Sequence, residues 1–287
     1  LRNPGRFSTT SRVRANDADL SSLTRFERAA LRVGARVNES PRAKRASRRF
    51  NELVTGRWMT LVSERRMTLL GLDHVRALRP DRGVLLAANH RSFFDMYMVL
   101  THLHKRVDWC ERAYFPVRST FWYDHPLGLL TNAMVSGMSM YPPIYREVEK
   151  RSVTRLGLDF LAAELQRPGT LVGIHPEGTR NKGDDPYDLL PAEQGFGRVV
   201  LSARPIVLPV FINGMANDFI HECRSTLDGS GMPIIMSFGP PVEFGEMLEA
   251  DPQRLRAQVA IGRRVLEEIA ALGSIERAER ETLATSA

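Results

Sequence analysis

Short apolar segments alternate with helical patterns along most of this 287-residue chain, and this alternation restricts the possible folds more than any other feature. Four apolar stretches have the length of buried strands, namely 83–88, 170–175, 205–211 and 233–238. Helical patterns lie among them at 93–104, 150–166 and 193–203. Such alternation is typical of α/β proteins. We therefore expect a mixed, largely parallel sheet flanked by helices.

The N-terminal part differs from this region in charge. Residues 1–50 contain thirteen Lys or Arg and four Asp or Glu, whereas the formal charge of the whole chain is +7, so the remainder is slightly acidic. Helical patterns cover residues 22–37 and 42–64, and the second combines basic residues with Phe50 and Trp58. Amphipathic helices of this kind bind anionic membrane surfaces. A solvated helical face packed on the domain explains the pattern equally well.

These differences divide the chain into three expected parts. Residues 1–66 are expected to form a basic helical membrane-association segment, residues 67–250 an α/β domain, and residues 251–287 a C-terminal helix and tail. Asp251-Pro252 is a typical helix start, with Asp as the N-cap and Pro at the first helical position. The helical pattern then continues to about Ala271.

Cysteine usage and hydropathy indicate the cellular setting. Cys110 and Cys223 show neither a disulfide framework nor a metal-ligand spacing, so we expect a reducing compartment and no metal site. The chain contains no strongly apolar run of about 18 residues, and Leu1–Pro4 lacks the apolar region of a signal peptide. We therefore expect a cytoplasmic protein that binds peripherally at the inner face of the membrane.

The stretch Asn89–Asp95 follows the apolar strand 83–88 and leads into a helical pattern. On one continuous helix, His90 and Asp95 would lie about 140° apart, so they can meet only if the histidine lies in the preceding turn. Ser92 as N-cap, with Asp95 three residues later, fits this geometry. The pair is then a candidate general base with its orienting carboxylate, a combination that contributes a factor of about 10²–10⁴ to rates. The alternative is a helix cap beside a packing histidine.

A second polar block, Pro176-Glu177-Gly178-Thr179-Arg180, follows strand 170–175. Ligands of α/β proteins bind at the carboxyl edge of the sheet, where this pattern places the block. Gly178 permits close backbone approach, and the Arg180 guanidinium can bind a phosphate through two hydrogen bonds. A plain polar turn after a strand is the alternative.

Two further segments complete the candidate motifs. Tyr141–Arg146 is a stiff loop ending in an arginine, and Ile206–Val210 is an apolar strand that contains Pro209. Because proline cannot donate a ladder hydrogen bond, we expect this strand at a sheet edge or at a bulge. The uncharged segment 126–145 is rich in leucine and methionine, which fits either an acyl-chain channel or ordinary core.

Together, these motifs resemble those of the glycerolipid acyltransferase family, which includes the 1-acylglycerol-3-phosphate acyltransferases. The family's Asn-His-x4-Asp motif matches Asn89, His90 and Asp95. Its Phe-Pro-Glu-Gly-Thr-Arg motif matches Pro176–Arg180, with His175 in place of the Phe. The loop ending in arginine and the strand with proline match the two remaining motifs in order and spacing.

The resemblance implies a role for each matched residue. His90 deprotonates the hydroxyl of an acceptor, which attacks the thioester of acyl-CoA or acyl carrier protein, and Asp95 orients the histidine. Arg146 and Arg180 hold the phosphate of the acceptor, and Glu177 positions the arginine or the acceptor. The implied substrate-binding residues are Arg146, Glu177, Gly178, Thr179 and Arg180.

The implied reaction requires no cofactor and no protein nucleophile, because a thioester is already activated. Consistently, the chain contains no Gly-x-Ser-x-Gly elbow and no Walker A loop. The expected acceptor is a lysophospholipid or glycerol-phosphate-type molecule, with 1-acylglycerol-3-phosphate first. The expected partners are the acyl donor, this acceptor and an anionic membrane surface.

Two departures from the family pattern leave the acceptor open. Tyr145 precedes Arg146 where Asp or Asn is frequent, and Gln194-Gly195 stands where Lys-Gly is frequent. A glycolipid or an amino-acid lipid is therefore an alternative acceptor, and a catalytically inactive lipid-binding protein is another alternative. The pI of about 9.8 suggests a nucleic-acid-binding protein. Because the basic excess lies in residues 1–50, we expect no nucleic-acid partner.

Overall fold

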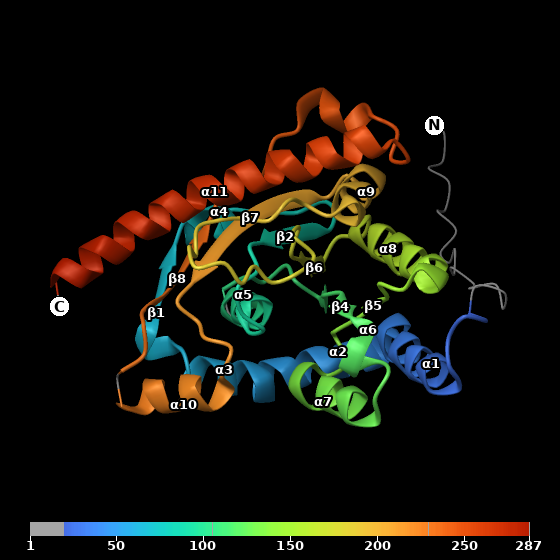
Figure 1. The fold of residues 1–287 in the computed structure, drawn as a ribbon, viewed down its shortest axis with the longest axis horizontal. Coiled ribbons are helices and arrows are strands. Elements are labelled where there is room, and N and C mark those ends of the chain that lie inside the picture. The colour runs from blue at the N-terminus through green and yellow to red at the C-terminus, as the bar shows by residue number, and fades with distance from the viewer. Residues whose placement is uncertain (1–19, 105, 229, 287) are drawn as a thin grey trace, which may run out of the picture.

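In the computed structural model, which describes residues 20–104, 106–228 and 230–286, the centre of the molecule is a six-stranded sheet (Figure 1). Its strands are β1 (Met67–Leu70), β2 (Val84–Ala88), β3 (Arg112–Tyr114), β6 (Thr170–Ile174), β7 (Ile206–Asn213) and β8 (Ile234–Phe238). They lie in the order β1-β8-β7-β2-β6-β3. Only β7 and β8 are antiparallel neighbours within this sheet. The expected mixed, largely parallel sheet flanked by helices is confirmed.

Helices cover both faces of the sheet, and the alternating side chains of β2 show which helices lie on each face. Val84 and Leu86 pack in a core that includes residues of α3 (Gly56–Leu61), α4 (Leu72–Arg76) and α5 (Asp95–His104). Leu85 and Ala87 pack in a second core that includes residues of α8 (Arg151–Leu165), α9 (Gln194–Ala203) and α11 (Leu255–Ser286). All of β2 is buried, which explains why its sequence is continuously apolar.

The remaining helices lie along the side of the molecule that carries α3 (Figure 1). They are α1 (Arg25–Glu39), α2 (Pro41–Phe50), α7 (Pro126–Ser136) and α10 (Phe219–Asp228). A π-helical turn, Asn51–Thr55, joins α2 to α3, so the helix expected at 42–64 consists of three consecutive pieces. The smaller elements are α6 (Ser119–Trp122) and the two-stranded sheet of β4 (Val117–Arg118) and β5 (Pro143–Ile144). Short 3-10 turns cover Glu64–Arg66, Val148–Lys150 and Gly245–Glu249.

Local capping explains where the first two helices begin. Thr24 and Glu27 form a reciprocal capping box at the start of α1. Ser40 caps α2, in which Pro41 occupies a position of the first turn that does not require a backbone donor. Among the described residues, no helix is both long enough and apolar enough to cross a bilayer. The first 19 residues of the basic N-terminal segment lie outside the described residues.

The structure corrects the expected position of Pro209. Its strand β7 lies inside the sheet, between β2 and β8, and Pro209 pairs in register with Ala87 of β2. The Pro209 carbonyl accepts a hydrogen bond from the Gly239 backbone, on the β8 side. In an extended residue the N–H and C=O groups point to the same side, so no hydrogen bond to β2 is lost. The β7–β8 ladder begins only at Val210, and proline is therefore tolerated in an interior strand.

The expected limits of the last helix are also wrong. Asp251 and Pro252 form a turn, and α11 begins at Leu255 and extends to Ser286 instead of ending near Ala271. Glu276 stabilises this extension, because its fully buried carboxylate accepts hydrogen bonds from Tyr187 and Arg280. These contacts join α11 to a loop about 90 residues earlier in the chain, which a local helical pattern does not reveal.

A glycine marks the boundary between β1 and α4. Strand β1 ends at Leu70, and the following Gly71 has a φ of 69°, which favours glycine, before α4 begins. Helix α10 was not predicted from the sequence.

Candidate active site

The candidate site is built where β2 ends and α5 begins. Asn89 extends the pairing of β2 with β7, because its side-chain amide donates to the Ile212 carbonyl at 3.0 Å and its side-chain oxygen accepts from the Ile212 N–H at 2.8 Å. His90 is the next residue and lies in the turn before α5. This anchoring fixes the point at which the histidine leaves the sheet.

Asp95 is the first residue of α5, and its carboxylate turns back over the preceding loop. Its Oδ2 accepts backbone hydrogen bonds from Arg91 and Ser92, each at 2.7 Å. The same oxygen lies 3.3 Å from Nδ1 of His90. The expected geometry is therefore confirmed, and one buried carboxylate both caps the helix and contacts the histidine. With its proton on Nδ1, His90 keeps Nε2 available to accept another proton.

His175 packs directly against His90. The two imidazole rings are stacked, with centroids 3.8 Å apart and an interplanar angle of 6°. Nδ1 of His175 lies 3.0 Å from the Ala88 carbonyl and 2.9 Å from the Asn89 carbonyl, so this nitrogen must be the donor. His175 therefore supports the His90 ring from one side and occupies the position at which the family motif has Phe.

Burial dominates the electrostatics of these groups. Burial and the nearby Arg180 cation together lower the pKa of His90 to about 4. Burial also lowers the pKa of His175 to about 3, with a further contribution from the neighbouring His90. The Asp95 carboxyl has a pKa raised by burial to about 6, which its backbone hydrogen bonds partly oppose. Near pH 7 the site therefore holds two neutral imidazoles and an ionised carboxylate.

Glu177 lies beneath the site and holds two loops together. One carboxylate oxygen accepts from the His90 N–H at 2.8 Å, and the other accepts from the Leu190 N–H at 2.8 Å. The side chain is buried, and burial raises the pKa of its carboxyl. Both oxygens thus bind backbone, which makes Glu177 a positioning residue for His90 in this structure.

Arg180 is held at the edge of the site by two groups. Its guanidinium lies over the Phe93 ring, 3.6 Å from the centroid, and donates to Oδ1 of Asn217 at 2.7 Å. The same Asn217 oxygen accepts from the Phe93 N–H at 3.2 Å. Asn217 therefore links the arginine to the loop of His90, which brings a fixed cation close to the candidate base.

Arg146 lies in a different part of the chain and contacts the Pro176–Arg180 block. Its guanidinium donates to the Gly178 carbonyl at 2.9 Å. Gly178 has a φ of 62°, and a Cβ at this position would lie 2.5 Å from the Glu193 side chain, so glycine is required there. Gly178 and Thr179 are exposed, and Arg146 is exposed as well. Four of the five expected substrate-binding residues therefore lie in the loop 177–180, and the fifth, Arg146, binds the backbone of this loop.

This arrangement can now be compared with known proteins. A family model described as Acyltransferase matches residues 66–213, which include His90, Asp95, Arg146 and the loop of Arg180. The chain belongs to the acyltransferase family.

One curated relative of this chain is named 1-acyl-sn-glycerol-3-phosphate acyltransferase and comes from Borreliella burgdorferi. The two sequences are 27% identical over 109 residues, which cover 38% of this chain and 41% of the relative. The chain therefore matches about two fifths of the length of this relative.

Several residues of the acyltransferase site were missed by sequence reasoning. Asn217 lies 37 residues after Arg180, and no motif marks it. Arg91 holds the loop after the second motif, because it donates to the Gly183 carbonyl at 2.7 Å. Asn181 donates from its backbone to the His90 carbonyl at 2.8 Å. Arg91 and Asn181 each follow a motif residue directly in the sequence, and this position could have identified them as residues of the site.

The uncharged segment 126–145 serves two purposes in the acyltransferase fold. Met138 and Met140 are buried and act as ordinary core. Leu127, Leu130 and Met134 project from α7, and each is more than half exposed. These exposed side chains line a surface, and the role of the segment as an acyl-chain channel stays a prediction. Within the described residues, no cluster of three His, Cys, Asp or Glu side chains is arranged to hold a metal ion.

Proposed function

We propose that this acyltransferase moves a fatty acyl group from an acyl thioester to the hydroxyl of a 1-acylglycerol-3-phosphate-type acceptor. The observation that carries the proposal is a neutral His90 held by Asp95, with the Arg180 cation fixed beside it. A general base needs an unprotonated nitrogen at working pH, and a phosphate-bearing acceptor needs a cation nearby. Acyl-CoA or acyl carrier protein is the proposed donor.

The proposed reaction needs only one proton carrier from the protein. Nε2 of His90 takes the proton of the acceptor hydroxyl while the oxygen attacks the thioester carbonyl carbon. Asp95 stabilises the imidazolium that forms. The C–S bond then breaks, and the departing thiolate takes the proton from His90. The products are an ester and a free thiol, and the histidine returns to its neutral form.

The arginines support a phosphate-bearing acceptor. Arg180 uses one nitrogen to bind Asn217, and Arg146 uses one to bind the Gly178 carbonyl, so each guanidinium retains further N–H groups for an anion. The name of the curated relative agrees with this choice of acceptor. A glycolipid or amino-acid lipid acceptor remains the alternative because of Tyr145 and Gln194.

We further propose that the side formed by α2, α3 and α7 docks on the cytoplasmic face of an anionic membrane. Leu53, Trp58 and Leu61 are 57%, 45% and 69% exposed, and Leu127 and Leu130 of α7 are exposed as well. Helix α7 lies on the same side of the molecule as α2 and α3 (Figure 1). Exposed arginines, including Arg49 and Arg57, adjoin these apolar side chains. Apolar groups beside cations are the combination that binds an anionic bilayer surface.

The function is tested by thioester consumption with a panel of phosphate-bearing and neutral acceptors. His90→Ala is expected to lower kcat/KM by about 10²–10⁴-fold with every acceptor. Arg180→Ala should weaken only phosphate-bearing acceptors, whereas Arg256→Ala, an exposed arginine on α11, serves as the control. Full activity of His90→Ala would overturn the mechanism, and equal losses with neutral acceptors in Arg180→Ala would overturn the phosphate assignment.

Docking is tested by co-sedimentation with vesicles that contain anionic phospholipid. A double Leu53→Ser/Leu61→Ser variant should bind at least about tenfold more weakly, because two exposed leucines no longer enter the bilayer. The matched control is Leu255→Ser/Val259→Ser, which alters two exposed apolar side chains on α11. Unchanged binding of the first variant, or equal losses in both, would reject this docking surface.

A further inference from the structure

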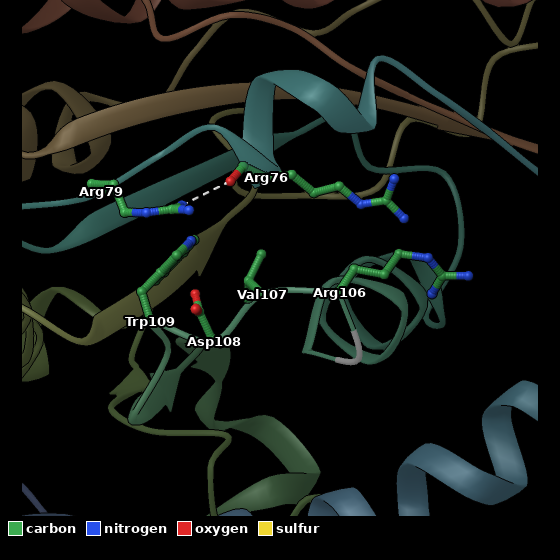
Figure 2. Close-up of a pocket in the computed structure, with 6 residues that line it drawn as sticks. All are labelled: Arg76, Arg79, Arg106, Val107, Asp108 and Trp109. Atoms are coloured by element: carbon green, nitrogen blue, oxygen red, sulfur yellow. Dashed lines mark hydrogen bonds between the residues drawn. The ribbon is translucent and has the colours of Figure 1, made fainter.

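An arginine-lined cavity, drawn in Figure 2, lies next to the segment that follows the C-terminal end of α5, whereas His90 precedes the N-terminal end of this helix. Its walls come from α4, the turn that follows it, and the segment after α5, and the cavity has a volume of about 380 Å³. The lining residues are Arg76, Arg79, Arg106, Val107, Asp108 and Trp109. Helix α5 begins at Asp95 and ends at His104, so its ten residues separate this cavity from the candidate active site.

The cavity concentrates positive charge that the described part of the chain does not neutralise. Arg76, Arg79 and Arg106 contribute three guanidinium groups, and Asp108 contributes one carboxylate. Throughout the described residues, none of these four side chains takes part in an ion pair. Like charges that line one cavity repel each other, and an anion placed among them would relieve this repulsion.

The hydrogen-bonding capacity of the arginines is largely unused. Nη1 of Arg79 donates to the carbonyls of Arg76 and Leu78, and Nη1 of Arg106 donates to the His102 carbonyl. These bonds orient the two side chains but leave their other guanidinium nitrogens without a hydrogen-bond partner among the described residues. Arg76 and Arg106 extend in the same direction from their separate elements, whereas the Arg79 guanidinium lies on the other side of the cavity, near Trp109 (Figure 2). An oxyanion between Arg76 and Arg106 can therefore accept N–H groups from both.

Trp109 forms part of the cavity wall on the side of Arg79 (Figure 2). Its indole offers a flat apolar surface. The cavity volume lies in the range of small-molecule sites, which fits a phosphorylated small molecule or one lipid headgroup.

We propose that this cavity is a second anion-binding site, separate from the acceptor site, that takes a phosphate-bearing ligand through Arg76 and Arg106. The shared chemistry is a phosphate group with at least two negative charges, either on a soluble molecule or on an anionic lipid.

Calorimetric titration with inorganic pyrophosphate tests the soluble source. The titration uses the full chain with Arg180→Gln, so that the proposed acceptor site does not contribute. We expect one bound pyrophosphate, and adding Arg76→Gln and Arg106→Gln should weaken its binding at least about tenfold. Adding Arg256→Gln and Arg263→Gln instead, which removes two exposed arginines of α11, should leave the affinity within about twofold.

Co-sedimentation with phosphatidylcholine vesicles that contain phosphatidate tests the lipid source in the same variants. A loss confined to the Arg76/Arg106 variant in either assay supports the site and identifies its source. Unchanged binding in both assays overturns the proposal, and so do equal losses in the α11 control, which would indicate general charge attraction. Thermal unfolding checks that each variant is folded. We expect all of them to fold, because the five substituted arginines are exposed or only half-buried.

Discussion

The His90–Asp95 pair and the N-terminal helices are assembled in different ways. In the pair, Asp95 binds three groups that lie within five residues of itself. The N-terminal helices are joined to the body by contacts between residues far apart in sequence. Asn38, for example, donates to the Met138 carbonyl at 2.8 Å. Contacts between residues close in sequence produce a motif that sequence analysis can recognise, whereas contacts between distant residues produce no such motif.

The buried side chain of Lys44 is the clearest case of the second kind. Its Nζ lies 2.6 Å from Oδ1 of Asn38 and 3.5 Å from the Ser139 hydroxyl, and it sits 3.8 Å from the centroid of the Tyr114 ring. The charge count of the first 50 residues suggests a surface segment. The structure shows that one of these cations instead enters the core between α2 and the body.

The largest effect is expected at Asp95. Asp95→Ala removes both the partner of His90 and the acceptor of two backbone N–H groups, so kcat/KM should fall by about 10²–10⁴-fold. The free energy of unfolding should also fall, by about 1–3 kcal/mol, because buried donors lose their acceptor. Steady-state kinetics and urea unfolding measure the two quantities. Normal kinetics in Asp95→Ala would show that the carboxylate is only a helix cap.

Lys44→Met tests whether the N-terminal helices depend on a buried charge. Burial lowers the pKa of Lys44 to about 7 in the folded state, below its usual 10.5. The resulting penalty is fully present below pH 7 and disappears as the pH rises from 7 toward 10.5, with a maximum of about 5 kcal/mol. Wild-type stability relative to Lys44→Met should therefore increase between pH 7 and pH 10. Parallel melting profiles across this range would contradict a buried, destabilised cation.

Asn217→Ala addresses the contact that sequence analysis missed. Without its oxygen, Arg180 loses one of its two supports, and the KM for a phosphate-bearing acceptor should rise about 5- to 10-fold while kcat changes little. Neutral acceptors provide the internal control, and they should show no change. A lower kcat with every acceptor would indicate that Asn217 supports the His90 loop instead.

The smallest effect is expected at His175. His175→Phe keeps an aromatic ring against His90, so kcat/KM near pH 7 should remain within about threefold of wild type, with stability reduced by about 1 kcal/mol. In both proteins kcat/KM should be constant above pH 7 and fall below about pH 6, where Asp95 takes up a proton. A profile whose acid limb differs in His175→Phe would show that His175 itself titrates during catalysis.

The comparison also explains what the sequence could predict. The alternation of apolar segments revealed the sheet and its flanking helices because each pattern reports burial along its own element. The His90–Asp95 pair and the Pro176–Arg180 block were visible because strand-end loops carry their functional residues consecutively. Asn217 and Lys44 were not visible, because only the folded chain brings them to their partners. The prediction from Pro209 that its strand lies at a sheet edge or at a bulge was wrong for a related reason. The side toward which the missing N–H points depends on the strand register, which the sequence does not show.

The position of β8 has a consequence for synthesis of the chain. This strand lies between β1 and β7, yet about 160 residues separate it from β1. At translation rates of about 5–20 residues per second, β1 waits roughly 10 to 30 s for the neighbour that joins it to the sheet. During this interval the β8-facing edge of β1 is open to pairing with other chains. Nascent chains that stall before residue 234 should therefore depend on chaperones to remain unaggregated.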